Sequence, residues 1–150
     1  MNQFNYIKYD GKIIAKAIKE STWAGRFEII NRNPLVIVDG AHNIDGVKAL
    51  IESLDALNMP KALLFSAIKT KDYEHMLELL NKHVDELVLT TFTHPLVIDG
   101  QQLAEKYHYH YEDDFKTAYQ ELSKKYPCVI VSGSLYFVST FLEYFKGQKR

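Results

Sequence analysis

The sequence predicts a three-layer α/β fold, in which a mostly parallel six-stranded sheet has one antiparallel edge strand and helices on both faces. Short apolar runs rich in β-branched residues alternate along the chain with segments of helical periodicity. No linker rich in proline, glycine or serine divides the 150 residues, and no internal repeat is visible. With 47% apolar and 25% charged residues, the chain suits a globular domain with a substantial core.

Six apolar runs are predicted to form the strands, because each is short and is bounded by polar or turn-forming residues. In chain order these runs are 27–31, 35–38, 63–67, 87–91, 109–111 and 129–132. A tight turn at Arg32-Asn33-Pro34 separates the first two runs. We therefore expect the first two strands to pair antiparallel at one edge of the sheet.

Six helices are predicted from apolar residues spaced three or four positions apart. In chain order they cover 13–18, 44–57, 73–84, 103–107, 115–122 and 135–145. Asn43 and Asp72 are predicted N-caps, and Asp113 or Asp114 is expected to cap the fifth helix. This alternation predicts a largely parallel, Rossmann-like sheet, and such sheets bind ligands at the carboxyl ends of their strands.

The composition excludes several classes of protein. A net charge of −1 argues against a nucleic-acid or membrane surface as the main partner, because phosphate binding usually requires a basic excess. The single cysteine, Cys128, excludes an intramolecular disulfide, and its apolar neighbours predict a buried, unreactive thiol. No apolar run approaches the ~18 residues of a membrane span. No signal peptide is visible either, so we expect a cytoplasmic protein.

The turn Asp39-Gly40-Ala41-His42-Asn43 follows the second predicted strand and precedes a helix. Asp39 can accept hydrogen bonds from hydroxyl groups such as those of a ribose, while His42, Asn43 and the helix amides can bind an anion. Gly40 permits a backbone angle closed to other residues and lets a ligand approach closely. The alternative is an ordinary turn, in which Asn43 caps the helix and Asp39 accepts backbone amides. Taken alone, this turn favours the alternative.

A second turn of the same kind, Ser132-Gly133-Ser134, follows the last predicted strand and opens the last helix. The Ser134 hydroxyl and the free amides can hold a carboxylate or a phosphate, or Ser134 can simply cap the helix. Both turns follow predicted parallel strands, so we expect them on the same rim of the sheet. Two such turns on one rim strengthen the case for a ligand site.

Other loops carry charged or metal-binding side chains. Arg26 suits bidentate contact with a phosphate, or it pairs with Glu28. Lys71 can hold a carboxylate, but an exposed lysine there needs no function. His108 and His110 resemble two metal ligands on one strand face, yet no third ligand is defined, so no metal site is predicted. The chain contains no phosphate loop of the form GxxxxGKS or GxxxxGKT.

Four stretches form a specific combination: WAGRFE at 23–28, DGAHN at 39–43, Lys71-Asp72, and GSLYF at 133–137. Together they resemble the carboxyl-terminal part of folylpolyglutamate synthase, an enzyme often combined with dihydrofolate synthase and part of the Mur-ligase superfamily. The resemblance runs from about Ile13 to the end of the chain. It implies a Mur-ligase-type carboxyl-terminal domain at 22–150. Residues 1–21 would be a linker and helical remnant of a missing amino-terminal ATPase domain.

The resemblance also implies an activity. Such an enzyme uses ATP to add L-glutamate to the γ-carboxylate of tetrahydrofolate through an acyl phosphate. The implied cofactors are ATP and Mg²⁺, with the metal ligands in the missing domain. The implied partners are ATP, tetrahydrofolate, L-glutamate and that domain, in a monomer. The chain on its own is expected to be inactive.

Roles for individual residues follow from the same motifs. Arg26 would contact the ATP phosphates, and Asp39 would hold the ATP ribose or orient its neighbours. His42 would lie near the transferred phosphate or the incoming glutamate. Ser134 and Lys71 would help to place that glutamate.

The sequence departs from the family pattern at two positions. Ala24 stands where many relatives have proline, and Leu96 stands where relatives often carry an arginine, which puts one substrate contact in doubt. Two other interpretations stay open. One is a related ligase domain for another acid, such as a cell-wall precursor, although DGAHN argues against it. The other is a stand-alone, flavodoxin-like binding module without chemistry, which the missing phosphate loop fits equally well.

Overall fold

The computed structural model describes residues 27–69 and 72–148. Within them, one six-stranded sheet has the order β1-β2-β6-β3-β4-β5. The strands are β1 (Glu28–Arg32), β2 (Leu35–Asp39), β3 (Lys61–Phe65), β4 (Glu86–Leu89), β5 (His110–Tyr111) and β6 (Cys128–Ser132). The β1–β2 pair at one edge is antiparallel, and the other four pairs are parallel. The predicted sheet is confirmed, whereas the predicted helix at 13–18 and linker at 1–21 lie outside the described residues.

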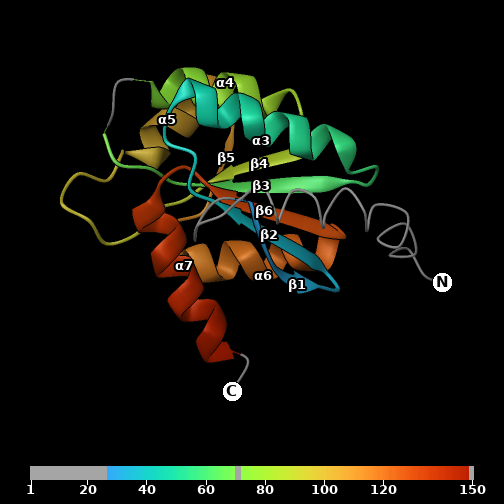
Figure 1. Cartoon of the computed structure of the whole chain (residues 1–150). Coiled ribbons are helices and arrows are strands. Elements are labelled where there is room, and N and C mark those ends of the chain that lie inside the picture. Colours follow the sequence, from blue (N-terminus) through green and yellow to red (C-terminus); the bar gives the residue numbers. More distant parts are fainter. Residues whose placement is uncertain (1–26, 70–71, 149–150) are drawn as a thin grey trace.

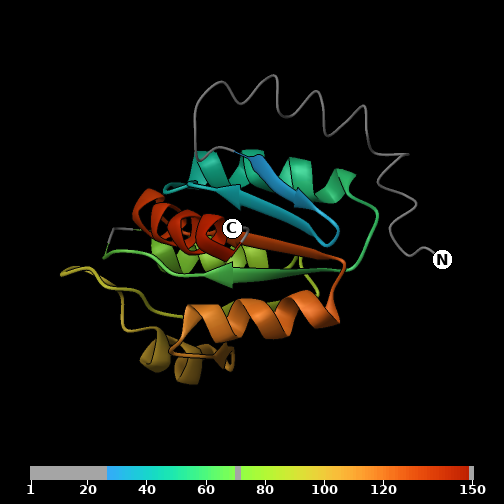
Figure 2. The ribbon, with the colours of Figure 1, turned by 90° about the horizontal axis from the view of Figure 1, so that it is seen from below.

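Helices cover both faces of this sheet (Figure 1). They are α3 (Ile44–Ala56), α4 (Tyr73–Asn81), α5 (Gly100–Tyr107), α6 (Phe115–Lys125) and α7 (Leu135–Gln148). Helices α3, α4 and α5 pack on one face, and α6 and α7 pack on the other, which is the face turned to the viewer in Figure 2. The fold is therefore the expected three-layer arrangement.

Alternating side chains of each central strand supply two separate cores. In β2, Leu35 and Ile37 point toward α3, α4 and α5, while Val36 and Val38 point toward α6 and α7; all four are fully buried. A strand covered on both faces needs apolar residues at every position, which explains the unbroken run LVIV. Cys128 in β6 is also fully buried. Burial raises the pKa of its thiol to about 12, so this cysteine is unreactive as predicted.

Side-chain caps fix most of the helix starts. The Gly46 amide donates to Asn43 Oδ1 at 2.8 Å at the start of α3, and the Lys116 amide donates to Asp114 Oδ1 at 3.1 Å at the start of α6. The Asn43 cap was predicted, and the structure selects Asp114 from the predicted pair Asp113 or Asp114. The predicted side-chain cap by Asp72 is wrong, because its backbone (φ −119°, ψ 16°) is not extended and its carboxylate makes no capping bond. No helix within the described residues is long and apolar enough to cross a membrane.

Candidate functional site

The two predicted turns follow neighbouring parallel strands. Asp39 and Ser132 are the last residues of β2 and β6, and they are partners in the strand register. The Ser132 hydroxyl donates a buried hydrogen bond of 2.6 Å to the main-chain oxygen of Asp39. The turns therefore start side by side at one rim of the sheet, and they lead into helices on opposite faces. This arrangement is a switch point, where open α/β sheets bind their ligands.

The carboxylate of Asp39 organises the loops around it. Asp39 is only 6% exposed. Its Oδ1 accepts the Ala41 amide at 2.8 Å, and its Oδ2 accepts the Phe27 amide at 3.1 Å. Phe27 has a positive φ of 39°, a backbone conformation that side chains disfavour. Asp39 thus ties the start of β1 to the DGAHN turn by accepting backbone amides, as the ordinary-turn alternative expects.

His42 faces solvent at the amino end of α3. Its Nδ1 lies 3.3 Å from the carbonyl oxygen of Gly40. Because a carbonyl only accepts, Nδ1 carries the hydrogen in this contact, and Nε2 is the ring atom presented to a ligand. A cavity of about 220 Å³ lies beside the ring, lined by Asp39, Gly40, Ala41, His42, Asn43, Asp45 and Gly46.

Ser134 is buried, 3% exposed, at the amino end of α7. Its Oγ accepts the Tyr136 amide at 3.0 Å, so it caps the helix while its hydroxyl hydrogen can still donate. Of the two turn glycines, Gly133 and not Gly40 has a positive φ, of 124°, so Gly40 does not use the backbone freedom that glycine permits. A Cβ on Gly133 would lie 2.1 Å from the carbonyl oxygen of Ser66, which follows β3.

Arg26 and Lys71, the two cations expected in this site, lie outside the described residues. A second cavity of about 780 Å³ lies between the start of α4 and α5. It is lined by Lys69, Tyr73, Glu74, Asp99, Gln102, Leu103, Glu105 and Lys106. Two cavities therefore lie near the strand ends. Among the described residues, those predicted for the site are found only in the lining of the smaller cavity, of about 220 Å³.

No metal site is present in the described part of the chain, where no group of three or more His, Cys, Asp or Glu side chains could hold an ion. The sequence placed His108 and His110 on one strand face, and this is wrong. His108 is the left-handed C-cap of α5 (φ 61°), so strand alternation does not apply to it.

Sequence reasoning missed two hydroxyl groups at the same rim. Ser66 and Thr90 directly follow β3 and β4 and are fully buried, and their hydroxyls have no hydrogen-bond partner among the residues that the structure describes. The Thr90 amide donates to the Phe65 carbonyl at 3.0 Å, which places the two residues on adjoining strand ends. The available signal was a polar residue inside each of the predicted runs 63–67 and 87–91.

Comparisons with known proteins show the family of this chain. A family model described as the Mur ligase, glutamate ligase domain matches residues 25–135. A protein named dihydrofolate synthase/folylpolyglutamate synthase from Bacillus subtilis (strain 168) is 26% identical, over 93% of this chain and 34% of that protein. A protein named folylpolyglutamate synthase from Lacticaseibacillus casei is 28% identical, over 91% of this chain and 33% of that protein. The chain therefore spans about a third of the length of these relatives.

Solved structures show the same fold. E. coli FolC in complex with DHPP and ADP aligns with a TM-score of 0.78 and 25% identity, covering 85% of this chain and 32% of that one. A bifunctional folylpolyglutamate synthase/dihydrofolate synthase from Yersinia pestis, complexed with AMPPNP and a Mn ion, aligns with a TM-score of 0.76 and 25% identity. That alignment covers 83% of this chain and 32% of the Yersinia chain. These matches confirm the predicted α/β fold and the resemblance noted in the sequence.

Proposed function

Because this chain belongs to the Mur ligase family of glutamate ligase domains, we propose that it is the carboxyl-terminal domain of an ATP-dependent amide ligase. In this proposal the whole enzyme adds L-glutamate to the γ-carboxylate of a tetrahydrofolate. The supporting observation is the pairing of the DGAHN turn with the Ser132-Gly133-Ser134 turn at one switch point. The domain would cover 22–150, and residues 1–21 would lead into an amino-terminal ATPase domain.

The chemistry requires an activated carboxylate, because hydroxide is a very poor leaving group. ATP would transfer its terminal phosphoryl group to the folate carboxylate, giving an acyl phosphate and ADP. The glutamate amine would attack the carbonyl carbon, the bond to phosphate would break, and the amine would lose a proton as the amide forms. All reactants are anionic, so cations and oriented dipoles should supply most of the catalytic effect.

Residues of this chain would position those anions. His42 presents Nε2 beside the smaller cavity, where it would meet the transferred phosphate or the incoming glutamate. Ser134 would donate its hydroxyl hydrogen to the glutamate, and Asp39 would hold the DGAHN turn in shape. Arg26 and Lys71 keep the roles that their motifs imply, with Arg26 on the ATP phosphates and Lys71 on the glutamate.

The described residues fit only part of this chemistry. Helices α3 and α7 both begin at the rim and direct their positive ends toward it, which suits an anionic ligand. The negative charge of Asp45, in the first turn of α3, would repel an anionic ligand. A cation is therefore needed nearby, and Arg26 would supply it. The described residues do not fit Mg²⁺, since they contain no metal-ligand group. We therefore place the Mg²⁺ ligands in the amino-terminal domain and derive no step through the metal here.

Several further proposals follow. The substrate sites would form only when the two domains close over ATP, so the isolated chain would be inactive. The whole protein would be a cytoplasmic monomer. The glutamate ligase assignment is favoured over a cell-wall ligase because the named relatives are folate enzymes.

The test is a substrate comparison with the product of the complete open reading frame that encodes this chain. Labelled glutamate, ATP and Mg²⁺ are offered with tetrahydrofolate, with dihydropteroate, or with a nucleotide-linked muramyl peptide. ATP-dependent incorporation with tetrahydrofolate supports the proposal. Incorporation only with the muramyl peptide identifies a cell-wall ligase. A folded protein inactive with every acceptor indicates a non-catalytic module.

A further inference from the structure

Exposed apolar side chains gather at the rim of the sheet beside Ser134. In the first turn of α7, Tyr136 is 56% exposed and Leu135 is 39% exposed, and Leu96, in the loop after β4, is 53% exposed. Leu96 joins the same surface through His94, because the Leu96 amide donates to His94 Nδ1 at 3.0 Å. The centroids of the His94 and Tyr136 rings are 4.7 Å apart. We call the surface of His94, Leu96, Leu135 and Tyr136 the rim patch.

A line of aromatic rings that begins in the core supports the rim patch. The Phe137 ring is fully buried, and its centroid lies 5.3 Å from that of Phe92, which is also buried. The Phe92 centroid lies 6.0 Å from that of His94, and His94 in turn contacts Tyr136. These separations are typical of paired aromatic rings. The exposed Tyr136 ring therefore rests against a neighbour that is itself anchored to the core.

Tyr136 is also tied to the candidate site. Its amide donates to Ser134 Oγ at 3.0 Å, and the Ser134 hydroxyl hydrogen can still donate to a ligand. An exposed aromatic ring and a donor suited to a carboxylate thus lie within one turn of the same helix. This combination suits a ligand in which a short chain joins an aromatic ring to a carboxylate.

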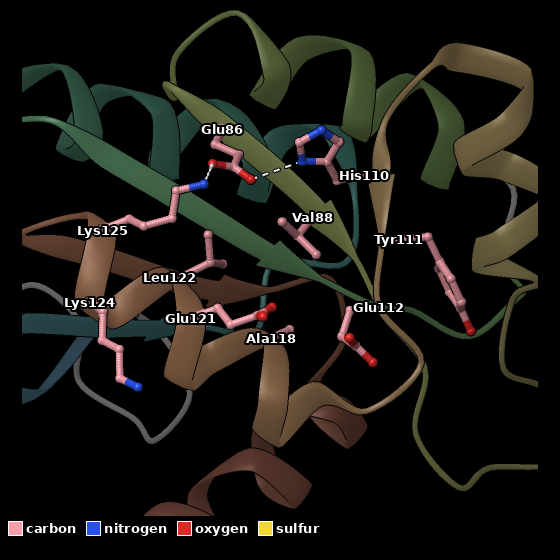
Figure 3. Close-up of a pocket in the computed structure, with 10 residues that line it drawn as sticks. All are labelled: Glu86, Val88, His110, Tyr111, Glu112, Ala118, Glu121, Leu122, Lys124 and Lys125. Carbon is pink, nitrogen blue, oxygen red and sulfur yellow. Dashed lines mark hydrogen bonds and ion pairs between the residues drawn. The ribbon is translucent and has the colours of Figure 1, made fainter.

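A cavity of about 460 Å³ at the β4–β5 edge of the sheet offers no comparable surface (Figure 3). In its wall, the Glu86 carboxylate accepts hydrogen bonds from Lys125 Nζ at 3.2 Å, the Tyr126 hydroxyl at 3.0 Å and His110 Nδ1 at 3.0 Å. Burial alone would raise the pKa of Glu86, but these three donors outweigh it and hold the pKa below its ordinary value. The aliphatic side chains that line this cavity are already buried, so a ligand would cover little apolar surface there.

We infer that Tyr136, supported by His94, stacks against the aminobenzoyl ring of the folate acceptor. This inference rests on the proposed function, because the proposed reaction supplies the ligand. In that reaction the folate γ-carboxylate meets the incoming glutamate, which Ser134 would help to place. A short flexible chain joins the γ-carboxylate to the aminobenzoyl ring, so the ring must lie near Ser134. Tyr136 is the exposed aromatic side chain at that position.

The other groups of the substrates suit the rim patch less well. Covering apolar surface is favourable in proportion to the area removed from water, and a pair of aromatic rings adds to this. The glutamate and the phosphates are charged, so they gain nothing from an apolar surface. The adenine of ATP is aromatic, but the ribose and the remaining phosphates separate it from the transferred phosphoryl group. Adenine must therefore lie farther from Ser134 than the aminobenzoyl ring does.

The test is a steady-state comparison in the product of the complete open reading frame that encodes this chain. The KM values for tetrahydrofolate, ATP and glutamate are measured together with kcat and the melting temperature. Tyr136→Leu keeps an apolar side chain but removes the ring, and should raise KM for tetrahydrofolate about fivefold, which corresponds to one aromatic pair. The other two KM values and kcat should stay at wild-type levels, because the ring contact is the same in the ground state and the transition state. Tyr136→Phe keeps the ring and should restore KM for tetrahydrofolate.

Tyr107→Leu is the matched control, since it removes a tyrosine ring that is 37% exposed at the end of α5. It should leave every kinetic constant unchanged. Three results would overturn the inference in an enzyme whose wild type is active. They are an unchanged KM for tetrahydrofolate in folded Tyr136→Leu, a rise in KM for ATP alone, which would identify adenine as the stacked ring, and a rise in all three KM values with a fall in kcat, which would identify a docking surface for the amino-terminal domain. A folded wild-type enzyme inactive with tetrahydrofolate would instead overturn the proposed function, and this inference with it.

Discussion

The hydroxyl of Ser132 donates to the main-chain oxygen of Asp39 at 2.6 Å, across 93 positions of the sequence. This bond joins the ends of β2 and β6 and sets the relative position of the two turns in the candidate site. The bond is buried, so breaking it would leave two polar groups away from water, which costs free energy.

Replacing Ser132 with alanine should therefore destabilise the chain. The expected loss is about 1 kcal/mol in the free energy of unfolding, the usual net value of one buried hydrogen bond. Ser53→Ala is the matched control, because the Ser53 hydroxyl makes only a long 3.5 Å bond at an exposed helical position. Urea denaturation of both variants measures the difference. Equal stability of the two would show that the Ser132 bond contributes nothing.

Gly133→Ala should destabilise the fold far more than the addition of a single methyl group usually does. The new methyl group would meet the Ser66 carbonyl at 2.1 Å, and φ of 124° is unfavourable for any side chain. We expect a loss of at least about 2 kcal/mol. Gly147→Ala in α7 has open space around it and should stabilise its helix by up to about 1 kcal/mol. Thermal denaturation showing the same change for both glycines would contradict the close approach of Gly133 to Ser66.

Thr90→Val should stabilise the protein. The Thr90 hydroxyl is fully buried and has no partner within residues 27–69 and 72–148, and valine keeps the shape while removing the desolvated group. A gain of about 1 kcal/mol in the free energy of unfolding is expected. Thr140→Val is the control, since the Thr140 hydroxyl is exposed and already donates to the Tyr136 carbonyl at 3.0 Å. A loss of stability in Thr90→Val would reveal a partner for the hydroxyl, such as a bound water.

Glu86 should make stability depend on pH in the acidic range. Its pKa is lower in the folded chain, so its carboxylate stabilises the fold fully above the ordinary glutamate pKa of about 4.3. That contribution is lost as the pH falls through the lowered folded-state pKa. Glu86→Gln should thus be less stable than wild type at neutral pH, and the gap should narrow in acid. Denaturation across this range, with exposed Glu143→Gln as control, measures the gap; a gap independent of pH would contradict the sign.

Local apolar patterns predicted most of the fold. Unbroken apolar runs identified β2 and β6. Asn43 was correctly predicted as a cap because short polar side chains reach nearby amides, whereas the cap of α6 was narrowed only to Asp113 or Asp114. The predicted positions of the strand ends were less accurate. Pairing of β3 begins at Lys61 and stops at Phe65, although the apolar run suggested 63–67. The chain stays buried through Ala67 after the ladder ends, and hydrophobicity alone does not show where pairing stops.

The candidate site was only partly predictable for a related reason. The sequence correctly predicted that the DGAHN and Ser132-Gly133-Ser134 turns share one rim, because the carboxyl ends of parallel strands meet there. It did not reveal which glycine adopts a positive φ, since that depends on how closely the Ser66 carbonyl approaches Gly133. Likewise, the hydrogen bonds of Glu86 with His110 and Lys125 join β4, β5 and α6. Only the folded arrangement brings those elements together.

The central claim is that the rim carrying His42 forms half of an ATP-dependent glutamate ligase site. The most direct measurement is glutamate incorporation into tetrahydrofolate by the complete gene product, by His42→Ala, and by a control, His75→Ala, on the exposed side of α4. The claim predicts a fall in turnover of about a hundredfold or more for His42→Ala, with an unchanged melting temperature. The control should keep wild-type turnover. Wild-type turnover in His42→Ala would contradict the claim.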